Sequence, residues 1–347
     1  MELSFHPYTL TLRGTFTIST YSRTTTPGIL VELRYDGLTG YGEASLPQYL
    51  GETVDNAAKF LSRVDLSQFK DPLMTDDILT HIAGIDHGHC AAKAAIDIAL
   101  HDLAGKIIGQ PCHKLLGLDK AKAPATSYTI GIGSPDETRG KVREAAAKYK
   151  ILKVKLGTDH DRQIIETIRQ ETDLPITVDA NQGWRDPAEA IDMAHWLAGQ
   201  GTLLIEQPFP REDLDMTARL SEASPIPIIA DEAVQRATDI PRLHGAFDGI
   251  NIKLMKCTGM REAWSMVATA RSLGMRVMLG CMTETSCAIS AAAQLSPAVD
   301  FADLDGNLLI SNDPFHGVTV SDGRLVLNDA PGIGVRPAER QAQTFTI

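Results

Sequence analysis

The pattern of apolar and polar positions changes along the chain. Up to about residue 50, apolar and polar residues alternate in stretches such as LTLRGTFTIST and GILVELRYDG, which predicts antiparallel strands separated by Gly and Asp turns. From about residue 53 to 106 apolar residues recur every three or four positions, above all in CAAKAAIDIALHDLAGK, which predicts helices. The first region is therefore expected to be a small α+β domain.

Between residues 126 and 305 a short aliphatic run recurs, each time followed by a polar residue or glycine and then by a segment of helix length. Successive run ends from Lys155 to Asp303 lie 22 to 27 residues apart, the length of one strand–helix unit. Eight such units close into a barrel more naturally than they extend into an open doubly wound sheet, and no GxGxxG follows the first run. We therefore predict an α/β fold with a (β/α)8-type barrel, a modified TIM barrel.

The predicted barrel covers residues 119–311, and residues 1–118 form an α+β capping domain. After residue 310 the stretch GVTVSDGRLVLND has the pattern of hairpin strands. Residues 312–347 are therefore expected to return to the capping domain.

Composition narrows the choice of partners. The chain has 33 basic and 44 acidic residues, a net charge of −11, and no run of more than two adjacent basic residues, which argues against a nucleic-acid partner. No basic and apolar leader begins it, and no apolar run of about 18 residues occurs, so no membrane association is expected. Five cysteines without a CxxC pair favour free thiols and a cytoplasmic location.

Three acids end consecutive predicted strands. Asp179, Glu206 and Asp231 lie in VDAN, IEQP and ADEA, and the carboxyl ends of barrel strands all open on one mouth. Three oxygen ligands around one point suit a hard divalent ion such as Mg²⁺. A helix N-cap or a salt bridge would explain one such acid alone, but three in series favour a metal site.

Two lysines, Lys155 and Lys253, end the second and sixth predicted strands, on roughly opposite sides of the mouth. An ordinary lysine is a poor base at neutral pH because its pKa is near 10.4. Lys153 lies on the same face of the strand as Lys155, so its charge, like that of a divalent ion, would favour the neutral form of Lys155. Either lysine alone could be a surface residue, but beside three acids we predict that both act as acid and base.

The motifs occur in an order and spacing that resemble the muconate-lactonizing subgroup of the enolase superfamily. They are KVK (153–155), DAN (179–181), EQP (206–208), ADE (230–232), NIK (251–253) and GCMTE (280–284), with GYGEAS (40–45) and AIDIALHDLAGK before them. The resemblance implies that Asp179, Glu206 and Asp231 bind one Mg²⁺ and that the capping domain closes over the substrate. Asn181 and Glu232, which adjoin these ligands, are expected to support them.

The expected reaction is inversion at a carbon next to a carboxylate. Removing the α proton builds a second negative charge, which a divalent ion stabilises as an enediolate. With Lys155 on one face and Lys253 on the other, a proton taken from one side can be replaced from the opposite side, which is a 1,1-proton transfer. Acid-sugar dehydratases of the superfamily usually carry a His base near the seventh strand, and RVMLGCMTE has none.

The substrate is predicted from residues away from the metal. Asp303 and Asp305 in ADLDG lie on one face of the last strand, and this pair resembles the dipeptide epimerases, in which it holds the amino terminus of the dipeptide. Arg23 lies in STYSRTTTPG, expected to be a polar loop of the cap, at about the place where a basic residue of similar epimerases meets a side-chain carboxylate. L-Ala-D/L-Glu is therefore the first choice of substrate. Lys153, Tyr49, Met282 and Glu284 are predicted as further substrate contacts.

Other readings of the same residues stay open. N-succinyl amino acid racemase, o-succinylbenzoate synthase and muconate cycloisomerase would use the same site, as would a dipeptide epimerase of different side-chain specificity. A barrel that binds metal or peptide without turnover is the alternative outside enzymes. A homo-oligomer is expected. One glycine stands in KCTGM (256–260) where the family more often has two, which leaves the shape of the pocket open rather than its chemistry.

Overall fold

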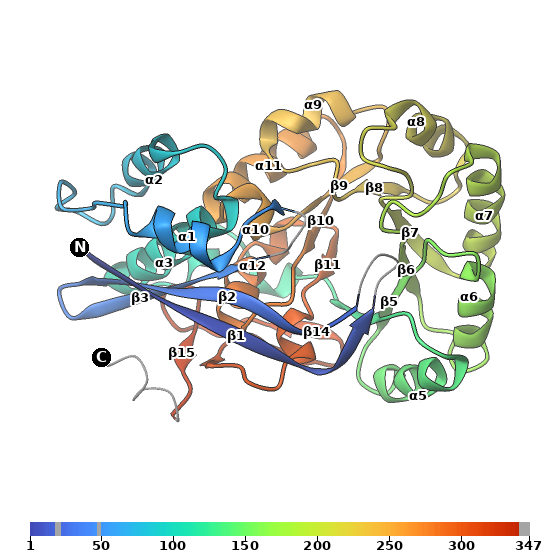
Figure 1. Ribbon diagram of the computed structural model, residues 1–347, viewed down its shortest axis with the longest axis horizontal. Helices are drawn as coiled ribbons and strands as arrows, with labels where there is room; N and C mark the ends of the chain where they lie inside the picture. The colour runs from blue at the N-terminus through green and yellow to red at the C-terminus, as the bar shows by residue number, and fades with distance from the viewer. Residues whose placement is uncertain (18–21, 47–49, 340–347) are drawn as a thin grey trace.

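The computed structural model describes residues 1–17, 22–46 and 50–339. Its N-terminal part is an antiparallel sheet in the order β1–β2–β3, which lies beside the barrel in Figure 1. The cap elements are β1 (Glu2–Thr17), β2 (Ser22–Tyr35), β3 (Leu38–Ser45), α1 (Val54–Leu61), α2 (Thr75–Ile85) and α3 (Cys90–Ile108). The expected α+β cap is confirmed.

Helix α3 packs directly on β3 because two glycines of the strand remove the side chains that would separate them. A Cβ at Gly42 would lie 1.9 Å from the backbone O of Ala95, and a Cβ at Gly40 would lie 2.1 Å from that of Ala99. The alanine-rich helix is itself buried on nearly all sides. The sheet and the helix of the cap therefore share one close-packed core.

Within the described residues, eight parallel strands stand in chain order around a barrel. They are β4 (Ser127–Ile130), β5 (Ile151–Lys155), β6 (Ile176–Asp179), β7 (Thr202–Glu206), β8 (Ile228–Ala230), β9 (Gly249–Ile252), β10 (Arg276–Gly280) and β11 (Phe301–Asp303). A parallel bridge between Thr126 and Ala302 joins the first strand to the last. The predicted (β/α)8-type barrel is confirmed.

The barrel is apolar at its base and charged at its mouth. Side chains two residues apart on a strand point to the same side. Leu204, Ile229 and Met278, which form one apolar cluster, therefore lie below Glu206, Asp231 and Gly280 inside the barrel. A packed base of this kind excludes water from beneath the charged residues at the carboxyl ends of the strands.

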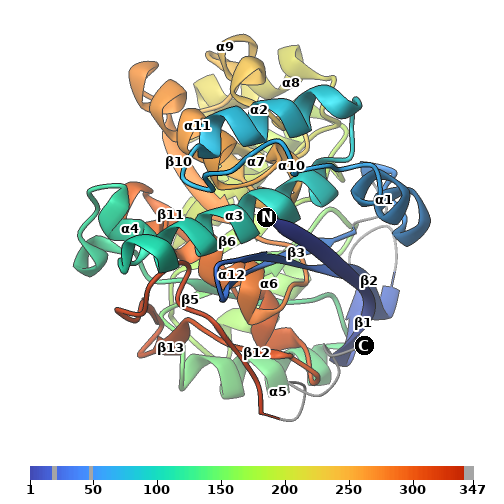
Figure 2. The ribbon, with the colours of Figure 1, turned by 90° about the vertical axis from the view of Figure 1, so that its left-hand side faces the viewer.

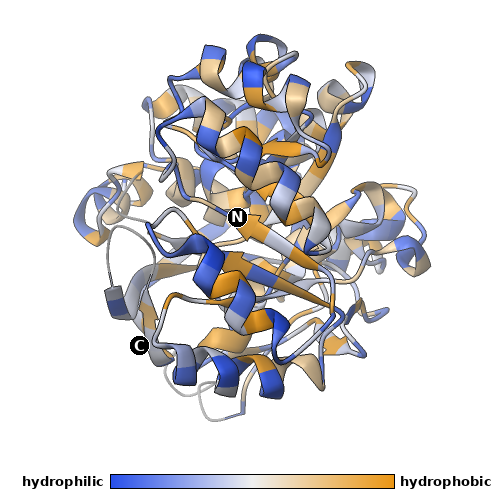
Figure 3. Ribbon diagram, turned by 90° about the vertical axis from the view of Figure 1, so that its right-hand side faces the viewer, coloured by the Kyte–Doolittle hydropathy of each residue, from blue (hydrophilic) through white to orange (hydrophobic). Residues whose placement is uncertain are grey.

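Helices surround the barrel, and Figure 3 shows hydrophilic and hydrophobic positions alternating along the ones on its far side from the cap. The helices that follow the cap in the chain are α4 (Cys112–Leu115), α5 (Pro135–Ala146), α6 (Asp161–Arg169), α7 (Pro187–Gly199), α8 (Leu214–Ala223), α9 (Ile240–Leu243), α10 (Leu254–Cys257), α11 (Met260–Ser272) and α12 (Ser286–Ala293). Short 3₁₀ turns are η2 (Lys120–Lys122), η3 (Ala237–Asp239), η4 (Ser296–Ala298) and η5 (Gly306–Leu309). In the part of the chain that the structure describes, no helix is long and apolar enough to cross a membrane. All five cysteines are described, and all are free thiols.

Two buried acids of the cap hold the N-termini of barrel helices. Glu43 on β3 accepts hydrogen bonds from the backbone N of Thr285 (2.9 Å) and of Ala288 (3.1 Å), at the start of α12. Asp97 on α3 accepts one from the backbone N of Met260 (2.5 Å), the first residue of α11. The first N–H groups of a helix lack partners within the helix, so both acids satisfy groups that would otherwise stay unpaired. These contacts fix the cap over the barrel mouth.

The C-terminal tail runs back along the cap, as Figure 2 shows. Its strands are β12 (Phe315–His316), β13 (Thr319–Ser321), β14 (Arg324–Val326) and β15 (Arg336–Pro337). The backbone N of Ser311 donates to Thr11 O on β1 (2.9 Å), and that of Ile333 donates to Asp102 on α3 (2.9 Å). The tail thus contacts both the sheet and the long helix of the cap, while the predicted boundaries at residues 118 and 311 stay predictions.

Candidate active site

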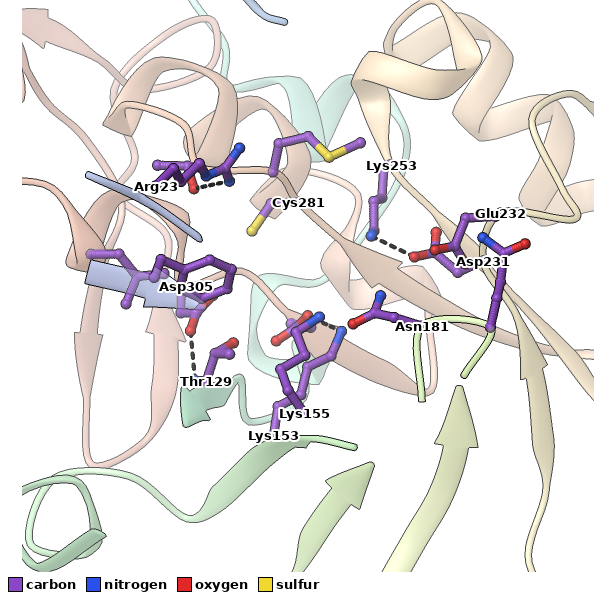
Figure 4. A pocket seen from close by; sticks show the side chains of 16 residues that line it. Arg23, Thr129, Lys153, Lys155, Asn181, Asp231, Glu232, Lys253, Cys281 and Asp305 are labelled. Carbon is purple, nitrogen blue, oxygen red and sulfur yellow. Dashed lines mark hydrogen bonds and ion pairs between the residues drawn. The ribbon is translucent and has the colours of Figure 1, made fainter. Parts of the chain in front are cut away.

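A cavity of about 320 Å³ lies between the carboxyl ends of the barrel strands and the first two strands of the cap. Figure 4 shows charged side chains converging on it from several strands. The barrel side of its lining includes Thr129, Lys153, Lys155, Asn181, Asp231, Glu232, Lys253, Asp303 and Asp305. The cap contributes Phe16 and Arg23.

The three predicted metal ligands form a buried cluster. One carboxylate oxygen each of Asp179, Glu206 and Asp231 lie within 4.8 Å of one another. Burial and the neighbouring charge of Asp179 raise the pKa of Glu206 to about 8, so the cluster opposes its own full ionisation. Bound positive charge relieves that repulsion, and an all-oxygen donor set suits a hard divalent ion.

Polar atoms beside the cluster support the same conclusion. Among the described residues, Asn181 Oδ1 and Glu232 Oε2 are buried without a hydrogen-bond partner. Burial and the charge of Asp231 raise the pKa of Glu232 to about 7. The residues present therefore fit a divalent cation, with oxygen atoms to spare around the three ligands.

The two predicted bases stand over different members of the cluster. Lys155 Nζ, at the end of β5, lies 2.6 Å from Asp179 Oδ2, and Lys253 Nζ, just after β9, lies 2.7 Å from Asp231 Oδ2. In Figure 4 they point into the cavity from separate walls. A substrate carbon held between them would present one face to each lysine.

Lys153 lies on the same side of β5 as Lys155, as its spacing predicts, and lines the cavity, but it also has partners that the spacing did not show. Its Nζ lies 2.6 Å from Glu206 Oε2, 2.8 Å from Asp303 Oδ2 and 3.3 Å from Asp179 Oδ2. Burial opposes the charge of Lys153, but these three carboxylates raise its pKa well above the ordinary value. Lys153 is therefore a buried cation that links the metal cluster to the last strand, and three acids balance the charge that was expected to act on Lys155.

Lys256 also belongs to the site, although it was not predicted from the sequence. Its fully buried Nζ forms an ion pair with Asp231 Oδ1 and donates to the backbone O of Asp231 (2.6 Å) and of Asn251 (3.1 Å). The signal available was a second lysine one helical turn after Lys253. Lys256 fixes one oxygen of Asp231, so that the other faces the mouth.

Two amides were also missed. Asn251 Nδ2 donates to Glu206 Oε1 (2.7 Å). Gln207, whose backbone takes a left-handed φ of 36°, accepts hydrogen bonds on Oε1 from the backbone N of Asp231 (2.9 Å) and of Ala233 (3.1 Å). Asn251 thus orients the carboxylate of Glu206, and Gln207 fixes the backbone that carries Asp231.

The two aspartates of the last strand have different surroundings. Asp303 is held on one oxygen by Ser127 Oγ (2.6 Å) and on the other by Lys153. Asp305 accepts a hydrogen bond from the backbone N of Thr129 (2.7 Å), and burial together with the charge of Asp303 raises its pKa to about 6. Both line the cavity, and Figure 4 shows Asp305 on the side away from Asp231.

Comparison with known proteins places this arrangement in a family. Residues 2–117 match the model of the mandelate racemase/muconate lactonizing enzyme N-terminal domain, and residues 137–341 match the enolase C-terminal domain-like model. The chain belongs to the enolase superfamily. It is 61% identical over 335 residues to an L-Ala-D/L-Glu epimerase of Bacteroides thetaiotaomicron, covering 96% of this chain and 88% of that one.

Solved structures of superfamily members are similar over nearly the whole chain. A substrate-liganded L-Ala-D/L-Glu epimerase from Bacillus subtilis has a TM-score of 0.89 at 29% identity, covering 97% of this chain and 99% of that one. A dipeptide epimerase from Cytophaga hutchinsonii, complexed with Mg and D-Ala-L-Val, has a TM-score of 0.91 at 27% identity, covering 99% and 97%. The chain therefore has the complete superfamily architecture of cap and barrel.

Arg23 differs from its predicted local structure. It was expected in a loop, but it lies at the start of β2, opposite Phe16 on β1. The register of the two strands shifts between Thr11 and Phe16 and pairing then resumes, which extends the hairpin over the cavity. The Arg23 guanidinium lies 5.7 Å from the centre of the Phe16 ring, and Nη2 donates to Thr283 Oγ1 (2.8 Å).

The three remaining residues that were predicted to contact the substrate have different outcomes. Met282 lines the cavity. Glu284 is buried beneath the loop, where it accepts a hydrogen bond from the backbone N of Met282 (2.9 Å), and burial with the charge of Glu43 raises its pKa to about 8. The structure thus places Glu284 behind the cavity wall, because the turn after β10 directs its side chain inward. Tyr49 lies outside the described residues.

Proposed function

We propose that the protein is a Mg²⁺-dependent dipeptide epimerase that inverts the α carbon of the C-terminal residue, with L-Ala-D/L-Glu as its substrate. The observation that carries the proposal is the placement of Lys155 and Lys253 on separate walls of one cavity, each over an acid of a buried carboxylate cluster. The identity of 61% to an L-Ala-D/L-Glu epimerase supports the choice of dipeptide.

The cluster of Asp179, Glu206 and Asp231 would hold the ion. When bound there, Mg²⁺ supplies a positive charge that stabilises the negative charge growing on the substrate carboxylate as the α proton leaves. Lys256 and Asn251 keep Asp231 and Glu206 in place in the meantime.

The two lysines carry the proton transfer. In one direction the neutral amine of one lysine removes the α proton, while the ammonium of the other delivers a proton to the opposite face. For the other epimer the roles are exchanged, so each lysine must serve both as base and as acid. Because each lies on its own strand end, neither has to move across the substrate.

The far end of the cavity would recognise the rest of the dipeptide. Asp303 and Asp305 offer negative charge to the free ammonium group, and Arg23 offers positive charge to an acidic side chain. Lys153, which lines the same cavity, keeps Asp303 in position. Arg23 lies on the cap, so the substrate side chain would meet the cap while the α carbon meets the barrel.

The test is incubation of the Mg²⁺-loaded protein with L-Ala-L-Glu in D₂O. We expect deuterium at the Glu α carbon by ¹H NMR and mass, and formation of L-Ala-D-Glu by chiral chromatography. Chelation of the metal should stop both, and added Mg²⁺ should restore them. Absence of exchange with every member of a dipeptide library would overturn the proposal.

Asp305→Asn separates this function from N-succinyl amino acid racemisation, because only the dipeptide carries a free ammonium. Asp303 is less suitable for the test, since its partner Lys153 also contacts Glu206. We expect the variant to lose about 10- to 100-fold in kcat/KM on L-Ala-L-Glu, as removal of a charged hydrogen bond does. Undiminished dipeptide activity, or faster turnover of N-succinyl-L-Glu by the native protein, would favour the racemase.

A further inference from the structure

We propose that Thr283 determines side-chain specificity by positioning the Arg23 guanidinium, so that dipeptides with an acidic second residue are preferred. This inference rests on the proposed dipeptide epimerase function. It concerns a barrel residue in the loop between β10 and α12 that reaches up to the cap. Thr283 acts through Arg23 and is therefore a positioning residue.

The geometry connects three separate segments of the chain. Thr283 is 3% exposed, and its Oγ1 accepts a hydrogen bond from Arg23 Nη2 at 2.8 Å. Its backbone O accepts a second one from Ser45 Oγ, also at 2.8 Å, at the end of β3. Thr283 is therefore held by one cap strand while it holds a side chain of another.

This contact restricts the side chain of an arginine, which is long and has many rotamers. An arginine loses rotamer entropy when it is ordered, and a binding site gains affinity when that loss occurs before the ligand arrives. Phe16 lies beside the same guanidinium at 5.7 Å from its ring centre. With Phe16 beside the guanidinium and Thr283 bonded to it, the charge of Arg23 stays at the wall of the cavity.

The position of Thr283 separates this effect from the chemistry. Within the described residues its hydrogen bonds lead to Arg23 and Ser45 of the cap, and not to the lysines or the carboxylate cluster. Figure 4 shows Arg23 on the opposite side of the cavity from Asp231 and Glu232. A change at Thr283 should therefore alter the choice of substrate more than the rate of proton transfer.

The test compares Thr283→Val, which keeps the shape and removes the hydroxyl, with Thr283→Ser, which keeps the hydroxyl. The readout is the ratio of kcat/KM for L-Ala-L-Glu to that for L-Ala-L-Leu. We expect Thr283→Val to lower this ratio about tenfold, mainly by raising KM for the acidic dipeptide. Thr283→Ser should keep most of the native ratio, because it keeps the hydroxyl. Thr217→Val is the matched control, because Thr217 is a buried threonine of α8 whose hydroxyl donates to Asp213 O.

Arg23→Met decides between the possible failures. If Arg23→Met lowers the ratio and Thr283→Val does not, the role of Thr283 is refuted while the proposed function stands. If adding Thr283→Val to Arg23→Met leaves the ratio of Arg23→Met unchanged, Thr283 acts through Arg23, and a further fall in the ratio would refute that. An equal loss on both dipeptides in Thr283→Val would overturn the inference, and a native protein without exchange on any dipeptide would overturn the function itself.

Discussion

The barrel wall and the cap wall of the cavity are built in different ways. On the barrel wall, Lys155 stands opposite Asp179 in the register of β5 and β6, and Asp179 stands opposite Glu206 in that of β6 and β7. On the cap wall, Phe16 and Arg23 pair beyond a shift in the register of one hairpin. The β6–β7 ladder also shifts, between Ile176 and Val178, but strands on both sides hold the charged residues of the barrel, whereas the end of a single hairpin holds Arg23 of the cap.

The barrel wall is also more deeply buried than the cap wall. Asp179, Glu206 and Asp231 are almost completely buried, while Phe16 and Arg23 are only half-buried. A charge inside a close network cannot be replaced without disturbing its neighbours, but a charge at a rim can be exchanged with less cost. We infer that the barrel wall sets the reaction and that the cap wall sets the side chain that is accepted.

The largest effect on activity is expected when one catalytic lysine of the barrel wall is removed at a time. We expect Lys155→Ala and Lys253→Ala each to lower epimerisation by about 10²- to 10⁴-fold, equally for acidic and neutral dipeptides, because the general acid or base is lost. Any remaining α-hydrogen exchange in D₂O should start from one epimer only, and from opposite epimers in the two variants. Inversion at the native rate in either variant would refute the two-base mechanism.

Lys256→Met tests whether the barrel wall depends on its buried network. Removing one partner of a buried ion pair costs about 3–5 kcal/mol of unfolding free energy, which urea denaturation measures. Activity of the folded fraction should fall on all dipeptides alike, because Asp231 loses its fixed oxygen. Lys106→Met is the control: Lys106 similarly bridges Asp102 (2.6 Å) and Thr39 O (2.7 Å), but within the cap. Equal turnover in both variants would contradict a role for Lys256 in the site.

Arg23→Met tests the cap wall. We expect kcat/KM for L-Ala-L-Glu to fall by about 10- to 100-fold relative to that for L-Ala-L-Leu, the effect of a charged hydrogen bond. Arg13→Met is the matched control, since Arg13 lies on the same hairpin and donates to Leu308 O. A proportionate loss on both dipeptides would mean that Arg23 supports the fold of the cap and not the choice of side chain.

The barrel wall could be predicted from the sequence because its geometry follows from one rule. Parallel strands of similar length end at one level, so residues about 25 positions apart, such as Asp179, Glu206 and Asp231, meet at the mouth. Side-chain alternation then explains why the base of the barrel is apolar. These regularities need no knowledge of tertiary contacts.

The remaining features depend on contacts between distant segments. Glu43 and Asp97 cap barrel helices that lie more than 150 residues further along the chain, and no local pattern shows this. Arg23 was predicted to lie in a loop because the sequence does not show that the pairing of β1 with β2 shifts between Thr11 and Phe16 and then resumes at Arg23. Lys153 was predicted as a neighbour of Lys155 and as a substrate contact but not as a partner of Asp303, since Asp303 reaches it only when the barrel closes.

Thr258→Gly gives the smallest expected effect, and it addresses the single glycine of KCTGM. Thr258 has a left-handed φ of 71°, which costs a β-branched residue about 1–2 kcal/mol. The next residue, Gly259, has a φ of 116° and lies against the side chain of Asp97. We expect Thr258→Gly to raise the unfolding free energy by about 1 kcal/mol in urea denaturation. Thr269→Gly, inside helix α11, should instead lower it by a similar amount. If both variants are less stable, the contacts of the Thr258 side chain stabilise the fold by more than its backbone strain costs. The cap would then be held to the barrel at this point by side-chain packing.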